Sequence, residues 1–226
     1  MTLRDRIVAT ARELFATRGY ENTTIADIIE TAGASKGGFY HHFSSKGEIL
    51  EELIKTYITM VKTAYQKILD DTSQNVIEKF IASYYKLGEH KKDAIQDYER
   101  IQKTYMFERN QHLLRKMGEA FESATAFFYH ELFMQGINEG VFRTEYPEEL
   151  AHMWSREVIR FHRMSVKIFT GEESSETRFY RTLRFNERLI NSQLGLHDGE
   201  IALEAMGREY LENMKRFVEA KDGLND

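Results

Sequence analysis

Apolar residues recur every three or four positions along most of the chain, which is the spacing of one face of an α-helix. The first such stretch predicts a helix over residues 3–18, ended by Gly19 directly after the basic residue Arg18. Its apolar face consists of Leu3, Ile7, Ala11, Leu14 and Phe15. The chain therefore begins with an amphipathic helix.

Two short helices are predicted next, separated by a tight turn. The first covers residues 25–32 and is ended by Gly33. Ser35 caps the second, which covers residues 36–42. Two short helices joined by a glycine turn on an apolar framework predict a helix-turn-helix.

Two pairs of polar residues have the spacing of a helix N-terminal capping box. Thr24 and Asp27 open the helix at residues 25–32, with Asp in place of the usual Glu. Ser45 and Glu48 open a long helix over residues 46–69. At 1.5 Å per residue that helix is roughly 35 Å long. It is long enough to leave one domain and enter another.

The rest of the chain keeps the helical period. Further helices are expected at residues 74–88, 92–108, 111–139, 147–169, 175–194 and 199–220. The predicted fold is all-α. It has an N-terminal three-helix domain with a helix-turn-helix at residues 1–47 and a larger all-helical domain at residues 48–226.

The amino-acid composition excludes several classes of protein. The 226 residues include one proline and no cysteine, which excludes disulfides, thiolate metal sites and a cysteine nucleophile and argues against a turn-dense β fold. No apolar run reaches the roughly 18 residues of a membrane span, and the N-terminus has no apolar signal core. We therefore expect a cytoplasmic protein without membrane contact.

The net charge of −5 does not by itself indicate a nucleic-acid partner. Residues 1–47 carry six Lys or Arg and five Asp or Glu, so the acidic excess lies in the remaining chain. A local basic patch on the N-terminal part remains able to bind phosphate, because exposed charges act over about 8–10 Å.

The short helix at residues 36–42 contains two adjacent glycines, which cost roughly 1 kcal/mol each relative to alanine. A helix pressed against DNA gains from them, because missing side chains permit close approach. Phe39 and Phe43 lie four residues apart and are predicted to pack inward, which turns Lys36, Tyr40 and His41 outward. This pattern favours DNA contact over a purely structural role.

The segment from residue 3 to about residue 55 resembles the DNA-binding domain of the TetR/AcrR family of bacterial transcriptional regulators. The matching motifs are GY before TT, then DII, AGASKG, FYHHF and SSKGEIL. The resemblance implies a homodimer that binds a palindromic double-stranded operator and responds to a small-molecule effector held by residues 48–226. It implies neither catalysis nor a cofactor. Repression is the expected sign of regulation, and activation stays open because the sign depends on where the operator lies relative to the promoter.

Carried over residue by residue, the resemblance implies particular DNA contacts. Lys36, Gly37, Gly38 and His41 would face the major groove, and Thr24, Tyr40, His42 and Lys46 would contact the backbone. With the cap Ser35, the expected DNA-binding set is Thr24, Ser35, Lys36, Gly37, Gly38, Tyr40, His41, His42 and Lys46. The plainer alternatives are a polar helix end for the two histidines and an ordinary surface lysine at position 46.

Abundant aromatic residues in the C-terminal part suit an apolar or aromatic effector. Tyr105, Phe127 and Trp154 are the candidates for lining its pocket, although most such residues on helices are ordinary core. The basic residues Arg100, Arg156, Arg160 and Arg163 either hold a carboxylate ligand or pair with nearby acids on a solvated face. The histidines are scattered, so no metal site is expected.

The dimer surface is expected in the late helices. The helices at 147–169 and 175–194 are the candidates, the latter through an apolar stripe of Leu183, Leu189, Ile190 and Leu194. Two other functions remain open. One is a regulator of the same fold controlled by a protein partner or by no inducer. The other is a helical enzyme, for which the sequence shows no catalytic constellation.

Overall fold

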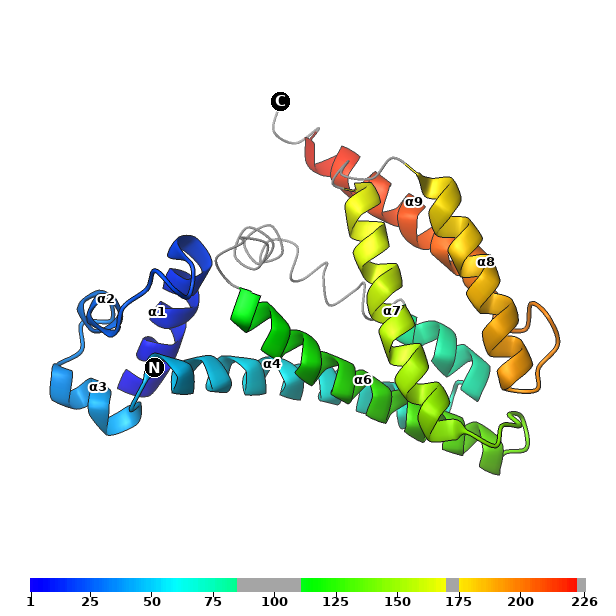
Figure 1. Ribbon diagram of the computed structural model, residues 1–226, viewed down its shortest axis with the longest axis horizontal. Coiled ribbons are helices and arrows are strands. Elements are labelled where there is room, and N and C mark those ends of the chain that lie inside the picture. The colour runs from blue at the N-terminus through cyan, green and yellow to red at the C-terminus, as the bar shows by residue number, and fades with distance from the viewer. Residues whose placement is uncertain (85–110, 170–174, 223–226) are drawn as a thin grey trace. The chain divides into compact units, whose positions relative to one another are not determined.

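The computed structural model describes residues 1–84, 111–169 and 175–222, and over these ranges the protein contains helices and no strand (Figure 1). The all-α expectation is confirmed. The helices are α1 (Leu3–Arg18), α2 (Ile25–Thr31), α3 (Lys36–His42), α4 (Lys46–Leu69), a helix over residues 76–84, α6 (Gln111–Asn138), α7 (Pro147–Phe169), α8 (Glu176–Gln193) and α9 (Leu203–Asp222). The helix expected at residues 92–108 lies outside the described residues.

Two compact units divide the chain. The first contains Met1–Thr63 and the α6 residues up to Phe121, and the second contains the chain from Ala64 to residue 84 and from Glu122 onward. Both α4 and α6 contribute to each unit. The compact N-terminal unit thus extends beyond the helix-turn-helix at residues 1–47, whose separate function stays a prediction.

Capping boxes fix the start of α1 and of α2. Asp27 N donates to Thr24 Oγ1 at 3.1 Å, and Thr24 N donates to Asp27 Oδ2 at 2.8 Å, so the predicted box is complete. Thr2 and Asp5 form an equivalent box on α1. Each box satisfies two backbone N–H groups that a helix start otherwise leaves unpaired. These local contacts define where the first two helices begin.

In the second unit, α8 and α9 lie side by side and α7 contacts both (Figure 1). The close approach of α8 and α9 occurs at Gly207, where an added Cβ would lie 2.1 Å from Leu183 Cδ1. Leu183, Ile190 and Leu194 are completely buried within the protomer. Three of the four residues of the predicted stripe therefore belong to the intrachain core, and only Leu189 is half-buried, which corrects the assignment of the stripe to a dimer surface.

The last helix begins at Leu203 and not at residue 199, where the periodicity places it. The side chain of Asn191 accepts from Ile201 N at 2.9 Å and donates to Ile201 O at 3.1 Å, which holds the preceding segment as a loop. Gly199 has φ of 88°, a conformation incompatible with a helix. The hydrogen bonds of the buried Asn191 amide thus keep the residues before Leu203 out of the helix.

Glu204 in the first turn of α9 links α9 to α8 through an ion pair. Its carboxylate accepts from Arg184 Nε at 2.6 Å and from Arg208 Nη2 at 2.7 Å. The hydrogen bonds from Arg184 and then Arg208 lower the pKa of Glu204 to about 2. The carboxylate is therefore ionised at neutral pH. The contact between α8 and α9 thus combines buried apolar residues with an ion pair between Arg184 and Glu204.

None of the helices in the described ranges is long and apolar enough to cross a membrane.

Replacing Gly207 by alanine should lower the free energy of unfolding by about 1–3 kcal/mol, because the new methyl group overlaps a buried leucine. Urea unfolding followed by circular dichroism measures this. Gly118→Ala is the control, because a Cβ at this α6 position meets nothing within 4 Å. The control should raise stability by up to about 1 kcal/mol. Equal stability of the two variants would contradict the packing described for α8 and α9.

Candidate functional site

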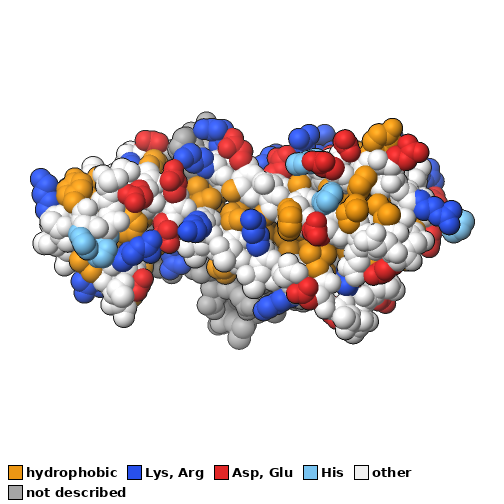
Figure 2. Space-filling model, turned by 90° about the horizontal axis from the view of Figure 1, so that it is seen from below, with side chains coloured by type: hydrophobic (Ala, Val, Ile, Leu, Met, Phe, Trp, Pro, Cys, Tyr) orange, Lys and Arg blue, Asp and Glu red, His pale blue; other side chains and the backbone are white. Residues whose placement is uncertain are grey.

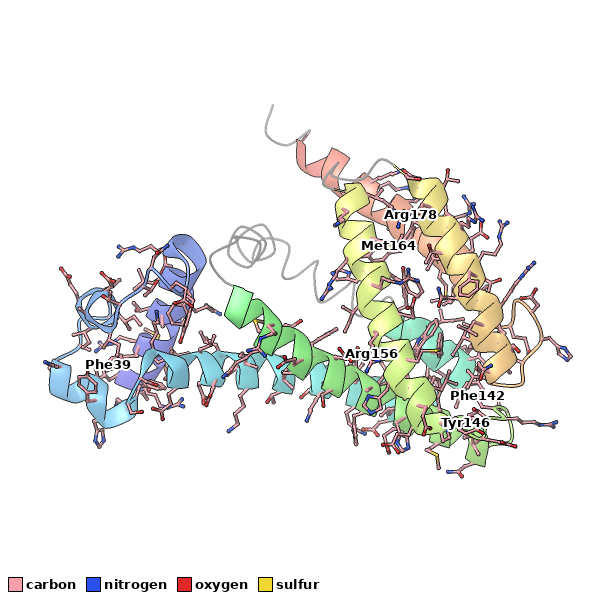
Figure 3. All side chains as sticks on the ribbon, in the orientation of Figure 1. Phe39, Phe142, Tyr146, Arg156, Met164 and Arg178 are labelled. Carbon is pink, nitrogen blue, oxygen red and sulfur yellow. The ribbon has the colours of Figure 1, made fainter. Side chains whose placement is uncertain are left out.

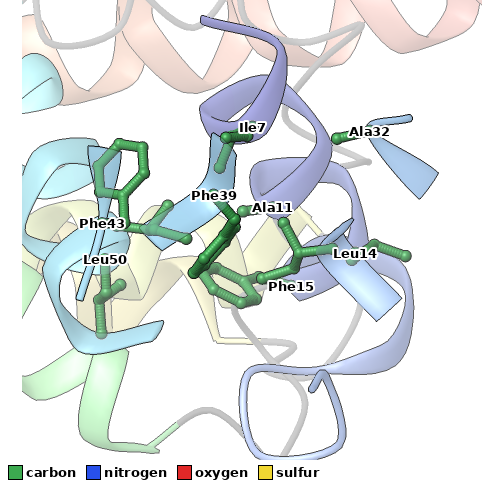
Figure 4. Packing of buried hydrophobic residues seen from close by; sticks show 10 residues of the cluster. Ile7, Ala11, Leu14, Phe15, Ala32, Phe39, Phe43 and Leu50 are labelled. Atoms are coloured by element: carbon green, nitrogen blue, oxygen red, sulfur yellow. The ribbon is translucent and has the colours of Figure 1, made fainter. Parts of the chain in front are cut away.

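A single apolar cluster holds α3 against α1, α2 and the start of α4 (Figure 4). Phe39 is fully buried and lies beside α1 (Figure 3). The Phe39 and Phe43 ring centroids are 6.3 Å apart. The cluster consists of Ile7, Ala11, Leu14, Phe15, Ile28, Ala32, Phe39, Phe43, Ile49 and Leu50. Two aromatic anchors four residues apart therefore fix the rotation of α3 about its axis.

The turn between α2 and α3 is tight and internally hydrogen-bonded. Gly33 has φ of 60°, and Ala34 N donates to Ile29 O at 3.0 Å. This is the hydrogen-bond pattern of a helix end with a left-handed glycine. Ser35 then caps α3, its Oγ accepting from Gly38 N at 3.0 Å. The turn and cap set the angle between the two helices.

The outward face of α3 carries the residues predicted to meet DNA. Lys36, Gly37, Tyr40 and His41 are exposed, and His42 is half-buried. In Figure 2, histidine side chains lie beside Lys or Arg side chains over the first unit. The structure therefore brings these predicted site residues together on one short helix.

The two glycines of α3 have different surroundings. A Cβ at Gly38 would lie 3.1 Å from Leu3 Cδ2 and 3.1 Å from Ser35 Oγ, so packing and capping restrict that position. A Cβ at Gly37 would meet nothing within 4 Å, and Gly37 does not adopt a positive φ. The protein's own packing therefore gives no reason for glycine at position 37.

Thr24 is exposed, but both of its polar groups are engaged. Its N–H and its hydroxyl both donate to Asp27 Oδ2, at 2.8 and 2.6 Å. These hydrogen bonds lower the pKa of Asp27, and Arg18 Nη1 lies 3.4 Å from Oδ1 of the same carboxylate. Thr24 thus acts as a helix cap here, and its predicted backbone contact requires the cap to rearrange or share its hydroxyl.

Lys46 is half-buried and bound inside the first unit. Its Nζ donates to Tyr20 O at 2.6 Å and lies 4.2 Å from the centroid of the Tyr20 ring. An ammonium group has three donors, so further contacts stay open to it. The plain surface-lysine interpretation does not describe this side chain, since it closes the α1–α2 turn onto α4. Its predicted phosphate contact stays a prediction.

The start of α4 differs from the predicted capping box in one detail. Ser45 Oγ accepts from Glu48 N at 3.2 Å, as expected. The Glu48 carboxylate accepts from the N–H and the hydroxyl of Ser44, at 2.7 and 2.9 Å, in place of Ser45 N. The reciprocal contact is therefore shifted by one residue along the chain.

Sequence reasoning missed Arg4 as a charge beside α3. Its guanidinium carbon lies 5.3 Å from the centroid of the Phe43 ring, and its Nη2 lies 3.1 Å from Glu52 Oε1. The helical period could have identified it, because the neighbouring Leu3 packs close to Gly38 of α3. Arg4 adds a cation to the surroundings of the site, although Glu52 partly offsets its charge.

Two of the three candidates for an effector pocket lie in the described residues, and they differ in burial. Tyr105 lies outside the described residues. Phe127 is 59% exposed, because the inward face of α6 is formed by residues such as Phe128 and Tyr129. Trp154 is 1% exposed and lies in the interior of the second unit. Phe127 therefore does not line that interior, whereas Trp154 lies within it, and a contact of Trp154 with an effector stays a prediction.

Aromatic rings and buried hydroxyls surround Trp154. Its ring centroid lies 5.3 Å from that of Phe80 and 5.9 Å from that of Phe161. Tyr129 Oη lies 2.9 Å from Ser83 Oγ, and burial raises the pKa of Tyr129 to about 12. The indole Nε1 of Trp154 is buried and makes no hydrogen bond of normal geometry with the described residues. The indole N–H also acts on the neighbouring Tyr129 hydroxyl, where it lowers the pKa of Tyr129 against the larger effect of burial.

The arginines of α7 lie on a solvated face. Arg156 Nε lies 2.7 Å from Glu122 Oε1, and Arg160 Nη2 lies 2.6 Å from Glu157 Oε2. Arg163 is exposed, and Arg100 lies outside the described residues. These contacts agree with the charge-pairing alternative. Over the described ranges, no three His, Asp or Glu side chains lie close enough to share a metal ion.

Known sequences match both the N-terminal unit and much of the remaining chain. Residues 7–53 match the sequence pattern of the bacterial regulatory proteins of the tetR family. The helix-turn-helix transcriptional repressor KstR2 of Mycolicibacterium smegmatis is 30% identical over 166 residues, which are 68% of this chain and 74% of that protein. KstR2 of Mycobacterium tuberculosis is 29% identical over 165 residues, which are 68% and 76% of the two chains.

A solved structure shares the fold. The crystal structure of a TetR-family transcriptional regulator from Syntrophomonas wolfei superposes with a TM-score of 0.59 at 22% identity, over 83% of this chain and 94% of that one. The helix-turn-helix geometry, the family match and the relative at 30% identity agree. The chain therefore belongs to the tetR family of bacterial regulatory proteins and is a DNA-binding transcriptional regulator, not an enzyme.

Proposed function

We propose that this protein is a homodimeric repressor that holds a palindromic operator through α3 of each copy. A small apolar or aromatic ligand in the second unit releases it from DNA. Its place of action is the bacterial cytoplasm, where the chromosome lies. The observation that carries the proposal is the outward face of α3, where exposed Lys36 and His41 flank a glycine that the protein's own packing does not require.

The contacts available on α3 divide into two kinds. Lys36 and His41 reach base edges in the major groove, where Gly37 lets the backbone approach closely. Tyr40 and His42 donate to phosphates, which position the helix without reading sequence. Ser35 contributes the cap that orients the first turn of α3. Few base-reading side chains remain, so DNA shape and deformability carry part of the specificity.

The second copy is proposed to dock on the outer face of α8. Phe185 is 67% exposed on α8, whereas the apolar residues on the opposite face of this helix are buried within the protomer. Exposed arginines surround it on α8, at positions 178, 181, 184 and 188. The exposed face of α7 carries basic residues and no comparably exposed aromatic side chain among those described. Of the two candidate helices, α8 is therefore the better supported.

The effector is proposed to enter the aromatic interior around Trp154. Apolar rings suit a hydrophobic ligand, and the buried hydroxyls of Tyr129 and Ser83 together with the Trp154 indole N–H suit a ligand that carries one polar group. Residues 64–69 of α4 belong to this unit, and the remainder of the same helix belongs to the first. A ligand that displaces residues 64–69 therefore also moves the rest of α4, because the helix is continuous. A coupling of about 1–3 kcal/mol is typical of such regulation.

The alternative is a regulator of the same fold that answers to a protein partner or to no inducer. Exposed Phe127 and Tyr146, 59% and 61% exposed, are compatible with it. Binding of small apolar molecules to the purified protein separates the two, because only the effector hypothesis requires it.

Gly37→Ala should stabilise the protein by up to about 1 kcal/mol while weakening operator binding by about tenfold or more. The methyl group meets no protein atom within 4 Å, so it favours the helix but obstructs DNA. Urea unfolding and fluorescence anisotropy, on a duplex that the wild-type protein selects from random DNA, measure the two effects. Gly118→Ala should stabilise the protein but leave its operator affinity unchanged. Unchanged DNA affinity of Gly37→Ala would show that α3 does not approach DNA closely.

Lys36→Ala and Lys46→Ala should differ in their effect on stability. Lys36 is exposed, so its loss should cost about 1–3 kcal/mol of DNA binding, relax base preference at one position and leave the melting temperature unchanged. Loss of Lys46 removes the contact with Tyr20 and should lower both the melting temperature and the affinity. If Lys46 also binds a phosphate, the slope of log affinity against log salt concentration should be smaller by about 1 for Lys46→Ala than for the wild-type protein. Equal melting temperatures would contradict the assigned role of Lys46.

Phe185→Asp should convert the protein to a monomer and reduce operator affinity by at least about tenfold, because it removes the aromatic anchor at the centre of the proposed interface and places a charge there that dimerisation must desolvate. Sedimentation velocity and anisotropy measure both properties. Tyr146→Asp is the matched control, since Tyr146 is similarly exposed outside α8. A Phe185→Asp variant that remains a dimer would place the interface elsewhere.

A further inference from the structure

The outer face of α7 carries acidic residues at one end and basic residues at the other. Glu148 and Glu149 are exposed in the first turn of the helix, and Arg160 and Arg163 are exposed in its C-terminal half. Glu149 and Arg163 are separated by close to four helical turns, so they lie on one face of α7, about 21 Å apart along the axis. This distance excludes a contact between the two side chains of one copy.

The helix dipole accounts for only part of this charge pattern. It favours acidic residues in the first turn of a helix and basic residues in the last turn. Glu148, Glu149 and Lys167 follow this rule. Arg163 lies more than one turn before Phe169, the last residue of α7, where the dipole has little effect. The dipole therefore does not account for the basic charge at position 163.

We propose that the outer face of α7 forms an antiparallel contact with α7 of a second copy, in which Glu149 of each copy pairs with Arg163 of the other. The inference rests on the proposed homodimer and extends its contact from α8 to α7. A two-fold axis brings the same surface of two copies together, so that surface must be complementary to itself. An axis near Arg156, midway between the two positions, places the acidic end of each α7 beside the basic end of the other.

The charges nearest to this axis are compensated within each copy. Arg156 lies near the middle of α7, with its Nε 2.7 Å from Glu122 Oε1 (Figure 3). Nη2 of Arg160 lies 2.6 Å from Glu157 Oε2. Ile159, between these two arginines, is half-buried and adds apolar surface. The middle of the contact is therefore close to neutral, and the attraction between two copies arises toward the ends of α7.

The exposed charges of α8 do not have this self-complementary pattern. They belong to arginines at positions 178, 181, 184 and 188, so antiparallel pairing of α8 with itself opposes like charges. Because α7 contacts α8 in the fold, the two helices can contribute to one interface (Figure 1). Phe185 then supplies apolar burial, and the ends of α7 set the register. Charged pairs at an interface contribute to specificity and register more than to affinity.

Charge reversal tests the proposed pair sharply, because its two members belong to different copies. Glu149→Arg places an arginine opposite Arg163 at both symmetry-related positions, and Arg163→Glu places a glutamate opposite Glu149. Each variant alone should dimerise at least about tenfold more weakly than the wild-type protein. An equimolar mixture of the two variants should recover the wild-type dimer, because the heterodimer has an attractive pair at both positions.

Sedimentation velocity at protein concentrations near the wild-type dissociation constant measures these changes. Glu131→Arg is the matched control, because it changes the net charge equally at an exposed position of α6 and should dimerise as the wild-type protein does. Circular dichroism verifies that each variant is folded. Fluorescence anisotropy on the selected duplex should show the same loss and the same recovery, since two half-sites require two copies.

Three results would overturn the inference, and only the last also contradicts the proposed homodimer. If both charge-reversal variants dimerise normally while Phe185→Asp is a monomer, the dimer stands without α7. If the mixture dimerises as weakly as each variant alone, Glu149 and Arg163 do not meet across the axis. If the wild-type protein is a monomer at all concentrations, the proposed homodimer fails together with the inference.

Discussion

The burial of Phe39 and Phe43 is the constraint on which the DNA-binding surface depends. A helix as short as α3 has little stability of its own, and the apolar cluster with α1, α2 and α4 supplies what it lacks. Because the two rings are four residues apart, they fix the rotation of the helix and not only its position. The exposure of Lys36, Gly37, Tyr40 and His41 is a direct consequence.

Much of this surface follows from the sequence because its determinants are local. The helical period, the Thr24–Asp27 box and the glycine turn each act within a few residues, and the structure has all three. The attachment of Lys46 to Tyr20 did not follow, since it joins positions 26 residues apart. Contacts between distant segments leave no periodic signal in a single sequence.

The C-terminal part was harder to predict for the same reason. An apolar stripe on α8 gives no indication whether another helix of the chain or a second copy covers it, and α9 covers it here. The loop before α9 depends on the buried amide of Asn191, ten residues upstream of Ile201. Phe127 points outward while Phe128 and Tyr129 point inward, a distinction that aromatic composition alone does not contain.

If two copies of α3 read one palindromic duplex, selection of bound duplexes from a random DNA library should recover a palindrome. Its half-sites should be centred about 34–36 Å apart, or a multiple of that distance, and the affinity should fall steeply as the salt concentration rises. Recovery of unrelated duplexes with no shared motif, from protein refolded to remove any bound ligand, would contradict this mode of binding.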